Sequence, residues 1–338
     1  MMEAYLYERL EDNKVRCNLC SHRCVIKDGR RGICNVREND GGILNTLVYG
    51  KLIAQHIDPI EKKPLFHFLP GTPSYSIATV GCNFRCRFCQ NADIAQMPSD
   101  REGTILGTRC TPGDVVDAAQ GGGCRSIAYT YTEPTVFFEF AYQTAKLAHD
   151  RDICNVFVTN GYMTSEALEM IEPYLDAANV DLKAFTDDYY KKVCGAGLKH
   201  VQATLKLMKS LDIFIEVTTL IVPGLNDDPS ELNDLAAFIA RDLGPETPWH
   251  ISRFHPTYKL TDRPSTPIQT LTTAREIGIN AGLRYVYTGN VPGNAAENTF
   301  CYSCGETVIE RWGFQVENLR LKNGKCTQCG VEIDGVWE

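Results

Sequence analysis

The stretch CNFRCRFC, residues 82–89, follows a short apolar run at 75–80 that we expect to form a buried strand. Its cysteines, Cys82, Cys86 and Cys89, are separated by three and then two residues, so one loop can surround an iron–sulfur cluster. A 4Fe-4S cluster normally takes four thiolates, and three would leave one iron open to a small molecule. The alternative is a structural zinc loop, although zinc sites usually combine paired Cys-x2-Cys units.

Composition and charge restrict the class of protein. The chain has 338 residues, of which 43% are hydrophobic, and this is enough for a large core. Its net charge of −8 argues against a nucleic-acid-wrapping surface, which would be basic. No apolar run reaches about 18 residues and a signal-peptide core is missing, so we expect no membrane span. Fifteen cysteines then indicate metal binding in a reducing, cytoplasmic compartment.

Residues 1–70 are expected to form an N-terminal segment with a metal site of its own. Four cysteines occur within eighteen residues of a helix-poor stretch: Cys17, Cys20, Cys24 and Cys34. Four thiolates would complete one closed site, and both zinc and an iron–sulfur cluster fit this ligand set. Unligated buried thiols are the alternative. A β-rich extension at 43–69 follows this four-Cys segment.

Residues 71–290 alternate between apolar β-branched runs and helix-like stretches. The predicted strands lie at 77–80, 127–131, 155–159, 178–182, 214–222 and 249–254. The predicted helices lie at about 112–120, 135–149, 164–174, 201–210, 230–242 and 270–281. Strict alternation favours βαβ units and a parallel sheet. Six units, with a further short run at 285–287, predict an α/β fold that is a partial (βα)6 TIM-like barrel.

Residues 291–338 have a different pattern, with two Cys-x2-Cys units separated by 21 residues. The four cysteines are Cys301, Cys304, Cys326 and Cys329. The intervening runs at 308–311 and 318–322 are expected to form hairpin strands. This pattern is typical of a zinc ribbon. Rubredoxin-type iron uses the same four thiolates, so zinc is expected and iron stays the alternative.

Polar side chains recur where the predicted strands end, which is the edge at which barrels collect functional groups. In chain order they are Glu133, Asn160, Asp181, Lys183 and His255. Each alone fits a structural role, such as a helix N-terminal charge for Glu133. Their common position predicts a site beside the cysteine loop.

Nearly end to end, the chain resembles the radical S-adenosylmethionine (SAM) proteins related to pyruvate formate-lyase (glycyl-radical enzyme) activating enzymes. Within them it is most similar to the AmmeMemoRadiSam system radical SAM enzyme subgroup. The segments that carry the resemblance are 17–24, 82–91, 129–134, 159–162, 181–183, 220–227 and 250–256. The resemblance implies a radical SAM barrel in which Cys82, Cys86 and Cys89 ligate a 4Fe-4S cluster that binds SAM.

The resemblance also implies contacts to the two ends of SAM. At the adenosine end, Phe88 would lie by the adenine, Val222 would contribute backbone contacts and His255 would stand nearby. At the amino-acid end, Glu133 would take the place of the acidic residue that ends the family's Gly-Gly-Glu motif and bind the ammonium group. Here Tyr-Thr precedes the Glu, which puts the backbone approach in doubt.

Three further positions complete the implied SAM site. Asn160 and the pair Asp181 and Lys183 match positions that contact the SAM amino acid and ribose in the activating enzymes. Of the remaining cysteines, we expect Cys110, Cys124 and Cys154 in the core, and Cys194 is a candidate thiol on the substrate side. Tyr129, Tyr131 and Tyr162 lie near the implied site and are expected mainly to pack.

The implied activity is that of an oxidoreductase-like radical enzyme. A low-potential electron donor of the flavodoxin or ferredoxin type would reduce the cluster, and SAM would be cleaved to methionine and a 5′-deoxyadenosyl radical. That radical would abstract hydrogen from an unidentified substrate, possibly a protein. The alternatives are a glycyl-radical-enzyme activase and a small-molecule or peptide modifier. A non-enzymatic iron–sulfur or zinc scaffold, or electron carrier, would have four ligands on every cluster, unlike residues 82–89. A zinc-ribbon nucleic-acid binder is disfavoured by the acidic net charge.

Overall fold

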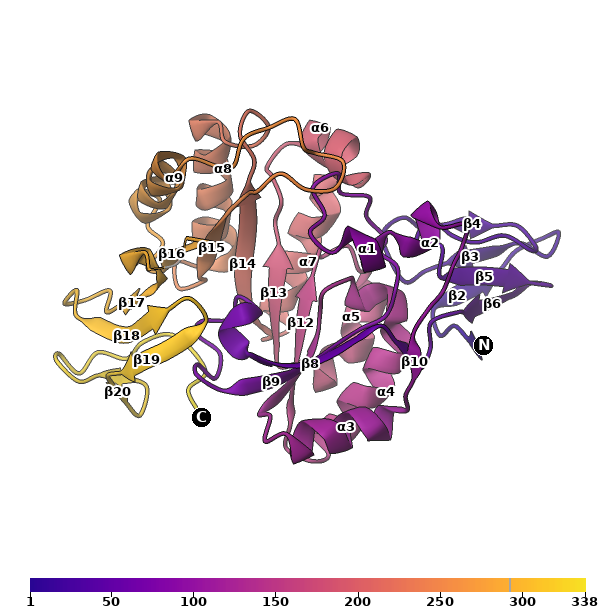
Figure 1. Ribbon diagram of the computed structural model, residues 1–338, viewed down its shortest axis with the longest axis horizontal. Helices are drawn as coiled ribbons and strands as arrows, with labels where there is room; N and C mark the ends of the chain where they lie inside the picture. Colours follow the sequence, from indigo (N-terminus) through magenta and orange to yellow (C-terminus); the bar gives the residue numbers. More distant parts are fainter. Residues whose placement is uncertain (292) are drawn as a thin grey trace.

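An eight-stranded sheet forms the centre of the computed structural model, which describes residues 1–291 and 293–338 (Figure 1). Seven of its strands run parallel: β9 (Pro73–Ala78), β11 (Ser126–Tyr129), β12 (Cys154–Thr159), β13 (Ala177–Asp181), β14 (Phe214–Ile221), β15 (Trp249–Arg253) and β16 (Val286–Gly289). The eighth, β8 (Ala54–Pro59), pairs antiparallel with β9. The order in space is β16-β15-β14-β13-β12-β11-β9-β8.

Six helices connect successive parallel strands: α3 (Pro112–Gly121), α4 (Phe138–His149), α5 (Ser165–Ile171), α7 (Leu198–Ser210), α8 (Pro229–Phe238) and α9 (Ile268–Asn280). Three of them begin at a side-chain cap. Thr111 forms a capping box with Asp114, Thr164 accepts a hydrogen bond from the third residue of α5, and Asp228 accepts two at the start of α8. Such caps are worth about 1 kcal/mol each, and they define where these helices begin.

The predicted partial barrel is confirmed, because each predicted strand and helix of residues 71–290 has a counterpart in this sheet and its connections. The further run at 285–287 is part of β16, and the sheet ends at β16 and β8 rather than closing. The edge strand β8 was not predicted as part of the sheet. It comes from the β-rich extension at 43–69, whose pattern indicated strands but gave no sign of their partner.

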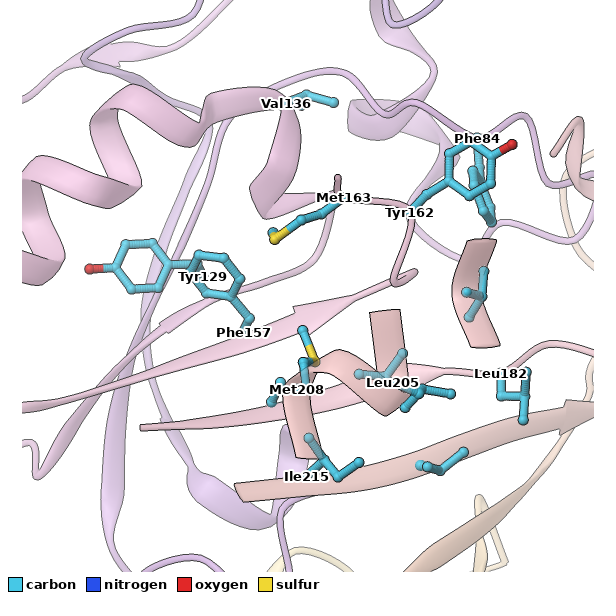
Figure 2. Close-up of a cluster of buried hydrophobic side chains, with 14 of the residues drawn as sticks. Phe84, Tyr129, Val136, Phe157, Tyr162, Met163, Leu182, Leu205, Met208 and Ile215 are labelled. Atoms are coloured by element: carbon cyan, nitrogen blue, oxygen red, sulfur yellow. The ribbon is translucent and has the colours of Figure 1, made fainter. Parts of the chain in front are cut away.

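Large apolar side chains fill the layer between the sheet and its helices (Figure 2). Tyr129 of β11 and Phe157 of β12 pack edge to face, with ring centroids 5.3 Å apart. Leu205 and Met208 of α7 are fully buried in the same cluster. Each such side chain contributes about 1.5–3 kcal/mol through burial, so this layer sets the relative positions of the strand ends.

The face of the sheet opposite this layer is partly covered by the segment 60–69. Its apolar side chains pack against Ala128, Val156 and Ala177 from three neighbouring parallel strands. Asn179 of β13 donates its side-chain N–H to a carbonyl of the segment at 2.8 Å. The segment 60–69, called the floor segment below, therefore covers part of the interior face of the partial barrel, and it precedes β9 in the chain.

The residues before β8 form two small three-stranded sheets at the end of the molecule opposite the C-terminal module (Figure 1). One contains β1 (Met2–Glu3), β5 (Arg37–Asp40) and β6 (Ile43–Thr46), and the other contains β2 (Tyr7–Arg9), β3 (Val15–Cys17) and β4 (Val25–Ile26). A separate pair joins β7 (Lys51–Leu52) to β10 (Thr108–Arg109). An ion pair attaches the N-terminal sheets to α4. Nη2 of Arg37, in β5, lies 2.5 Å from Oε2 of Glu139, in α4, and both side chains are at most 2% exposed.

The C-terminal module packs beside β16. Its strands are β17 (Thr299–Phe300), β18 (Thr307–Trp312), β19 (Gln315–Leu319), β20 (Leu321–Lys322) and β21 (Lys325–Cys326). Tyr287 of β16 shares a buried cluster with Val308 and Ile309 of β18. Arg311 extends the contact to the floor segment, donating to the carbonyl of Phe66 at 2.8 Å. The predicted hairpin is confirmed for the strand at 308–311, which lies in β18 and pairs with β19, whereas the predicted strand at 318–322 is divided between the end of β19 and β20, which pairs with β21. The predicted domain boundaries near residues 70 and 290 stay predictions.

Short helices occupy several connections: η1 (Ile60–Lys62), α1 (Ala92–Ala95), α2 (Met97–Asp100), η2 (Pro134–Phe137), η3 (Glu172–Tyr174), α6 (Asp187–Tyr189), η4 (Tyr190–Cys194), η5 (Ile239–Leu243) and η6 (Ala295–Glu297). All of them are too short to extend far from the barrel. In the part of the chain that the structure describes, no helix combines the length and the apolarity needed to cross a bilayer.

The Arg37–Glu139 pair yields a stability prediction. Glu139→Ala leaves a buried guanidinium without its carboxylate, and we expect the free energy of unfolding to fall by about 3–5 kcal/mol. Asp117→Ala removes the partner of Arg151 in a surface pair whose side chains are 67% and 40% exposed, and should cost less than about 1 kcal/mol. Urea titrations followed by circular dichroism measure both. Equal losses in the two variants would contradict the structural role given to the buried pair.

Candidate active site and metal sites

The cysteine loop begins after β9 with a sharp turn at Gly81, whose φ is +101°. A β-carbon at this position would lie 2.5 Å from Cγ1 of Val36, so both the conformation and the close approach require glycine. On its other side, the loop donates the N–H of Arg85 to the carbonyl of Cys194 at 2.8 Å. The loop is therefore held between the N-terminal segment and the connection that follows β13.

The three thiols of the loop are buried or half-buried. They do not crowd around one point: among the described residues, only the C-terminal cysteines have three or more ligand atoms all within 4.8 Å of one another. Sγ of Cys82 accepts a hydrogen bond from the N–H of Phe84 at 3.4 Å and lies 3.8 Å from Nδ2 of Asn160. Such N–H donors to cysteine sulfur tune iron–sulfur clusters. The loop thus fits a group larger than one ion.

The surroundings of Cys82 and Cys89 oppose free thiolates. Burial raises the pKa of the Cys82 thiol well above its ordinary value, and the nearby carboxylate of Glu133 raises it further. Burial also raises the pKa of Cys89 to about 11. Thiols of this kind lose their protons on binding a metal. Cys82 and Cys89 are therefore suited to ligation and not to chemistry of the free thiol.

Glu133 lies next to this loop, after β11, and is 1% exposed. Its side chain caps η2, since Oε1 accepts from the backbone N–H of Thr135 at 3.1 Å. The same oxygen accepts from the hydroxyl groups of Thr135 and Thr159, at 2.6 and 2.8 Å. Oε2 accepts one bond, from the N–H of Asn160 at 2.8 Å. A carboxylate offers about four acceptor positions, so Oε2 keeps capacity for one further donor.

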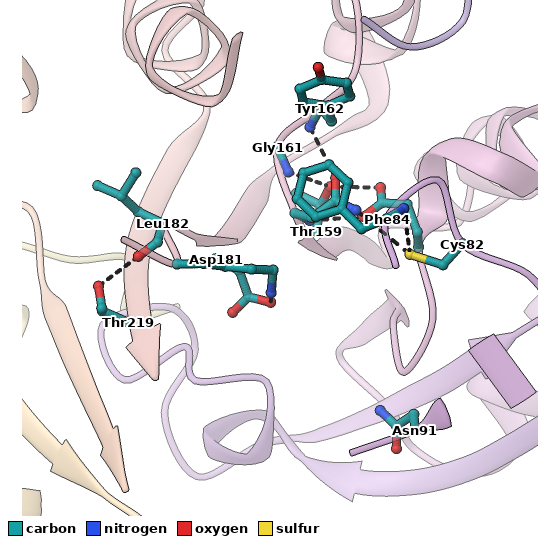
Figure 3. A network of polar contacts seen from close by, with 12 residues as sticks. Cys82, Phe84, Asn91, Thr159, Gly161, Tyr162, Asp181, Leu182 and Thr219 are labelled. Atoms are coloured by element: carbon teal, nitrogen blue, oxygen red, sulfur yellow. Dashed lines mark hydrogen bonds and ion pairs between the residues drawn. The ribbon is translucent and has the colours of Figure 1, made fainter. Parts of the chain in front are cut away.

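Asn160 joins the end of β12 to the cysteine loop. Its Nδ2 donates to Oδ1 of Asn83 at 2.7 Å, and its Oδ1 accepts from the N–H of Tyr162 at 3.1 Å. Figure 3 shows Cys82, Thr159 and Tyr162 gathered in this network. The structure therefore brings the predicted residues Glu133 and Asn160 together with the first cysteine of the loop.

The predicted pair Asp181 and Lys183 is formed at the end of β13. Lys183 Nζ lies 2.9 Å from Asp181 Oδ2, and the two side chains are 12% and 35% exposed. The same ammonium group stands 5.7 Å from the centre of the Phe88 ring. Coulombic contact with Lys183 also lowers the pKa of Cys86, although its hydrogen bond with Cys194 is the larger cause. This pair and Phe88 therefore lie at the loop's second cysteine.

The last two predicted residues have different surroundings. Both backbone polar groups of Val222 have partners within the chain: its N–H donates to Oδ1 of Asn226 at 2.6 Å, and its carbonyl accepts from Leu225 at 3.1 Å. A ligand would meet this residue through van der Waals contact or after these bonds break. His255 is exposed, and its Nδ1 lies 3.0 Å from the hydroxyl of Ser265. The SAM roles of all these residues stay predictions.

The four unassigned cysteines differ from expectation in two respects. Cys194, the candidate thiol on the substrate side, is fully buried, and its pKa is raised well above the ordinary value, first by burial and then by the neighbouring Cys86. Cys124 is buried as expected, whereas Cys110 and Cys154 are only half-buried. The sequence could not show this contact, because Cys194 is far from Cys86 along the chain.

The tyrosines behave largely as packing residues. Tyr129 is fully buried and its hydroxyl donates to Oδ1 of Asn155 at 2.9 Å. Tyr162 is buried against Phe84, with ring centroids 5.1 Å apart. Tyr131 has a positive φ of 59° and its hydroxyl donates to Asp58. Tyr131 therefore belongs to a polar group that the sequence did not predict.

That group consists of Asp58, Lys63 and Tyr131. Lys63 is 1% exposed, with Nζ 2.6 Å from Asp58 Oδ2 and 4.8 Å from the centre of the Tyr131 ring. Burial lowers the pKa of Lys63 to about 8, against the opposing effect of Asp58. The neighbouring Lys62 is 42% exposed. The sequence Lys62-Lys63 does not show which of the two lysines is buried. The two flanking prolines, at 59 and 64, indicate only that the backbone of this stretch is conformationally restricted.

The C-terminal cysteines form a compact group. Sγ of Cys301 lies 3.6 Å from Sγ of Cys329, and Sγ of Cys304 lies 3.8 Å from Sγ of Cys326. All four sulfur atoms lie within 4.8 Å of one another. Thiolates at about 2.3 Å from a tetrahedral zinc stand about 3.8 Å apart. The predicted set is brought together with the spacing of a single ion, which zinc or iron would satisfy.

The N-terminal cysteines are also brought together, but around a cavity. The cavity is lined by all four cysteines, which are Cys17, Cys20, Cys24 and Cys34. His22, Arg37 and Asn83 also line it. His22 Nε2 lies 2.8 Å from the carbonyl of Asn83, which is the second residue of the cysteine loop. Asn83 therefore belongs both to the lining of the N-terminal cavity and to the cysteine loop.

Two solved structures have the same fold at low sequence identity. A radical SAM methyltransferase from Sphaerobacter thermophilus superimposes with a TM-score of 0.51, 14% identity, and coverage of 66% of this chain and 68% of that chain. SuiB of Streptococcus suis, bound to S-adenosylmethionine, gives a TM-score of 0.50 at 12% identity, covering 62% and 48%. The fold and the three-cysteine loop at its strand ends define a radical SAM barrel.

Sequence comparison gives the family. The model described as the radical SAM superfamily matches residues 76–239. An uncharacterized protein of Methanocaldococcus jannaschii is 50% identical over 336 residues, which is 99% of both chains. The pyruvate formate-lyase-activating enzyme of Clostridium pasteurianum is 27% identical over 162 residues, covering 47% of this chain and 66% of that enzyme. This chain belongs to the radical SAM superfamily and is an enzyme.

The compact C-terminal group yields a metal prediction. Cys301→Ser removes one of four ligands, and because metal binding to such a module contributes on the order of 10 kcal/mol to folding, we expect the ribbon to lose its ion and unfold locally. Elemental analysis and limited proteolysis measure this, with iron bound at the barrel loop unchanged. Cys154→Ser, at a half-buried cysteine outside the group, is the matched control. Wild-type protein with neither zinc nor rubredoxin-like iron would contradict the prediction.

Proposed function

We propose that Cys82, Cys86 and Cys89 ligate a 4Fe-4S cluster with one open iron, at which SAM is bound and reductively cleaved. The observation that carries the proposal is the convergence of this loop with Glu133, Asn160 and Lys183 at the carboxyl edge of the sheet. When bound and reduced by a flavodoxin- or ferredoxin-type donor, such a cluster would supply one electron, which would cleave SAM to methionine and a 5′-deoxyadenosyl radical. The radical removes a hydrogen atom from the substrate.

The residues around the loop orient SAM. The free acceptor capacity on Oε2 of Glu133 suits the SAM ammonium group, and charge-assisted bonds of this kind are among the stronger ones. Asn160 is fixed by Asn83 and Tyr162, so it supports the loop and the ligand together. Lys183 brings a positive charge to Cys86, which favours a thiolate there. Phe88, Asp181, Val222 and His255 would line the remainder of the SAM site.

A segment after β15 is hydrogen-bonded to the loop. The N–H of Lys259 donates to the carbonyl of Arg87 at 2.9 Å, and the hydroxyl of Tyr258 donates to Asp100 at 2.7 Å. These bonds join the segment 255–266 both to the cysteine loop and to α2.

The substrate is open between two classes. The name of the Clostridium pasteurianum relative supports glycyl-radical activation, in which the substrate is a backbone glycine of a partner protein. The segment 255–266, which is bonded to the loop, and the buried Asp58, Lys63 and Tyr131 on the inner side, support a compact polar substrate. Incubation with SAM and dithionite, with and without candidate proteins, distinguishes the two classes. Activation predicts a protein-based glycyl radical signal in the partner, and modification predicts an altered small molecule or peptide.

Ligand removal from the loop tests the cluster. Cys82→Ala, Cys86→Ala and Cys89→Ala should each abolish SAM cleavage while the barrel stays folded, because the core lies in the layer between sheet and helices. The measurement is 5′-deoxyadenosine formed after anaerobic reconstitution with SAM and reductant, with circular dichroism on the same samples. Cys110→Ala, at a half-buried cysteine outside the loop, should retain the activity. Deoxyadenosine formation in any of the three loop variants would refute the ligand assignment.

Glu133→Gln tests the ammonium contact. The amide loses the charge and places an NH2 group where Oε1 or Oε2 accepted, so we expect SAM affinity to fall by roughly 1.5–3 kcal/mol, or one to two orders of magnitude. Iron content should not change. SAM titrations and thermal melts on the same samples measure both properties.

Thr111→Ala separates binding from capping in the Glu133 experiment. This variant removes the N-cap of α3, away from the predicted site, and should lower stability by about 1 kcal/mol without affecting SAM. If Glu133→Gln behaves as Thr111→Ala does, with unchanged SAM affinity and a lower melting temperature, then Glu133 acts only as the cap of η2.

A further inference from the structure

We propose that the N-terminal cavity lined by Cys17, Cys20, Cys24 and Cys34 binds a second iron–sulfur cluster, of the 4Fe-4S type and closed by all four thiolates. The proposal concerns a site outside the SAM-binding loop and does not depend on the SAM chemistry. It also decides between the two metals that the four-cysteine pattern allowed.

The first argument is the separation of the sulfur atoms. Zinc draws four thiolates to about 3.8 Å from one another, and the C-terminal group of this chain has that spacing. Across the described residues, no three of the N-terminal ligand atoms come within 4.8 Å of one another. In the loop at residues 82–89, the three cysteine sulfur atoms likewise do not all lie within 4.8 Å of one another. A cubane cluster bonds its thiolates to four different irons, so its ligands stand farther apart than those of one ion.

The second argument is the cavity that the four cysteines enclose. Leu19, Ile26, Ile33 and Val136 contribute apolar walls to it. Gly32 also lines it, and a β-carbon there would lie 3.7 Å from Sγ of Cys24. Cysteines around an apolar, enclosed space suit a cluster whose low potential requires shielding from water.

The third argument is a pair of unused hydrogen-bond donors. Arg37 lines the cavity and is 2% exposed; its two Nη atoms bind Glu139, but Nε has no partner among the residues that the structure describes. Asn83 also lines the cavity at 1% exposure, and within the same described residues its Nδ2 has no partner. A buried donor without an acceptor is destabilising. Sulfur atoms of a cluster would accept from both groups, and the guanidinium charge would offset part of the thiolate charge.

The position of the cavity indicates what a second cluster could do. Asn83 belongs to the cysteine loop, and Thr135 and Val136, which line the cavity, follow Glu133 by two and three residues. Four thiolates on four irons leave no open iron for SAM. A cluster there is therefore limited to structural support or to passing single electrons between an external low-potential donor and the neighbouring loop.

The experiment compares full-length variants reconstituted anaerobically with iron and sulfide. Wild-type protein should contain about eight irons and eight sulfides in clusters, and the triple variant Cys82→Ala, Cys86→Ala, Cys89→Ala should retain about four of each. After reduction with dithionite, the triple variant should show an electron paramagnetic resonance signal that SAM does not alter. Cys20→Ser with Cys24→Ser should lose that signal and keep a SAM-responsive one.

Cys304→Ser is the matched control for single-ion sites, since it should lower zinc by about one per chain and leave sulfide unchanged. About four sulfides in wild-type protein, with zinc at both terminal sites, would overturn the proposal. The iron and sulfide contents of wild-type protein do not depend on whether the variants fold. These contents alone therefore decide whether a second cluster is present. If the SAM-independent signal is present but no part of the wild-type signal responds to SAM, the proposed function fails and the second cluster stands.

Discussion

The proposed function depends on a loop that would have to hold three thiolates firmly and leave a fourth coordination position free. A loop held by three ligands has little stiffness of its own, so its neighbours must supply it. Here Gly81 turns the chain against Val36, and Arg85 is bonded to the carbonyl of Cys194 on the opposite side. Both supporting segments are distant in the chain, so the loop is in place only when the N-terminal segment and the barrel are both folded.

The strand ends provide the second part of the same support. Glu133 accepts four hydrogen bonds, and three of them come from Thr159, Asn160 and the backbone of Thr135. One carboxylate therefore starts η2, ties β11 to β12 and retains an acceptor position beside Cys82. Its burial raises its pKa, and the hydrogen bonds oppose that increase. If Glu133 binds SAM as proposed, stability and ligand binding are coupled at this residue, and only paired measurements can separate them.

The sequence predicted the helices, the parallel strands and the set of strand-end residues, because each depends on local periodicity or on position relative to a strand. It could not predict contacts between distant segments. The pairing of β8 with β9, the burial of Lys63 rather than Lys62, and the contact of Cys194 with Cys86 all arise from packing. Cysteine spacing had the same limit, since it specified four N-terminal ligands but not how far apart folding places them.

The buried pair Arg37 and Glu139 connects stability with electrostatics at the N-terminal site. A buried ion pair rarely adds much stability compared with apolar packing, so its cost needs a compensating role. Glu139 binds both Nη atoms of Arg37, which lines the cavity, and among the described residues Nε has no hydrogen-bond partner. The carboxylate thus fixes the orientation of a cation whose remaining donor is useful only to an acceptor in the cavity. An anionic cluster there would recover the cost of burying that donor, and a vacant set of neutral thiols would not.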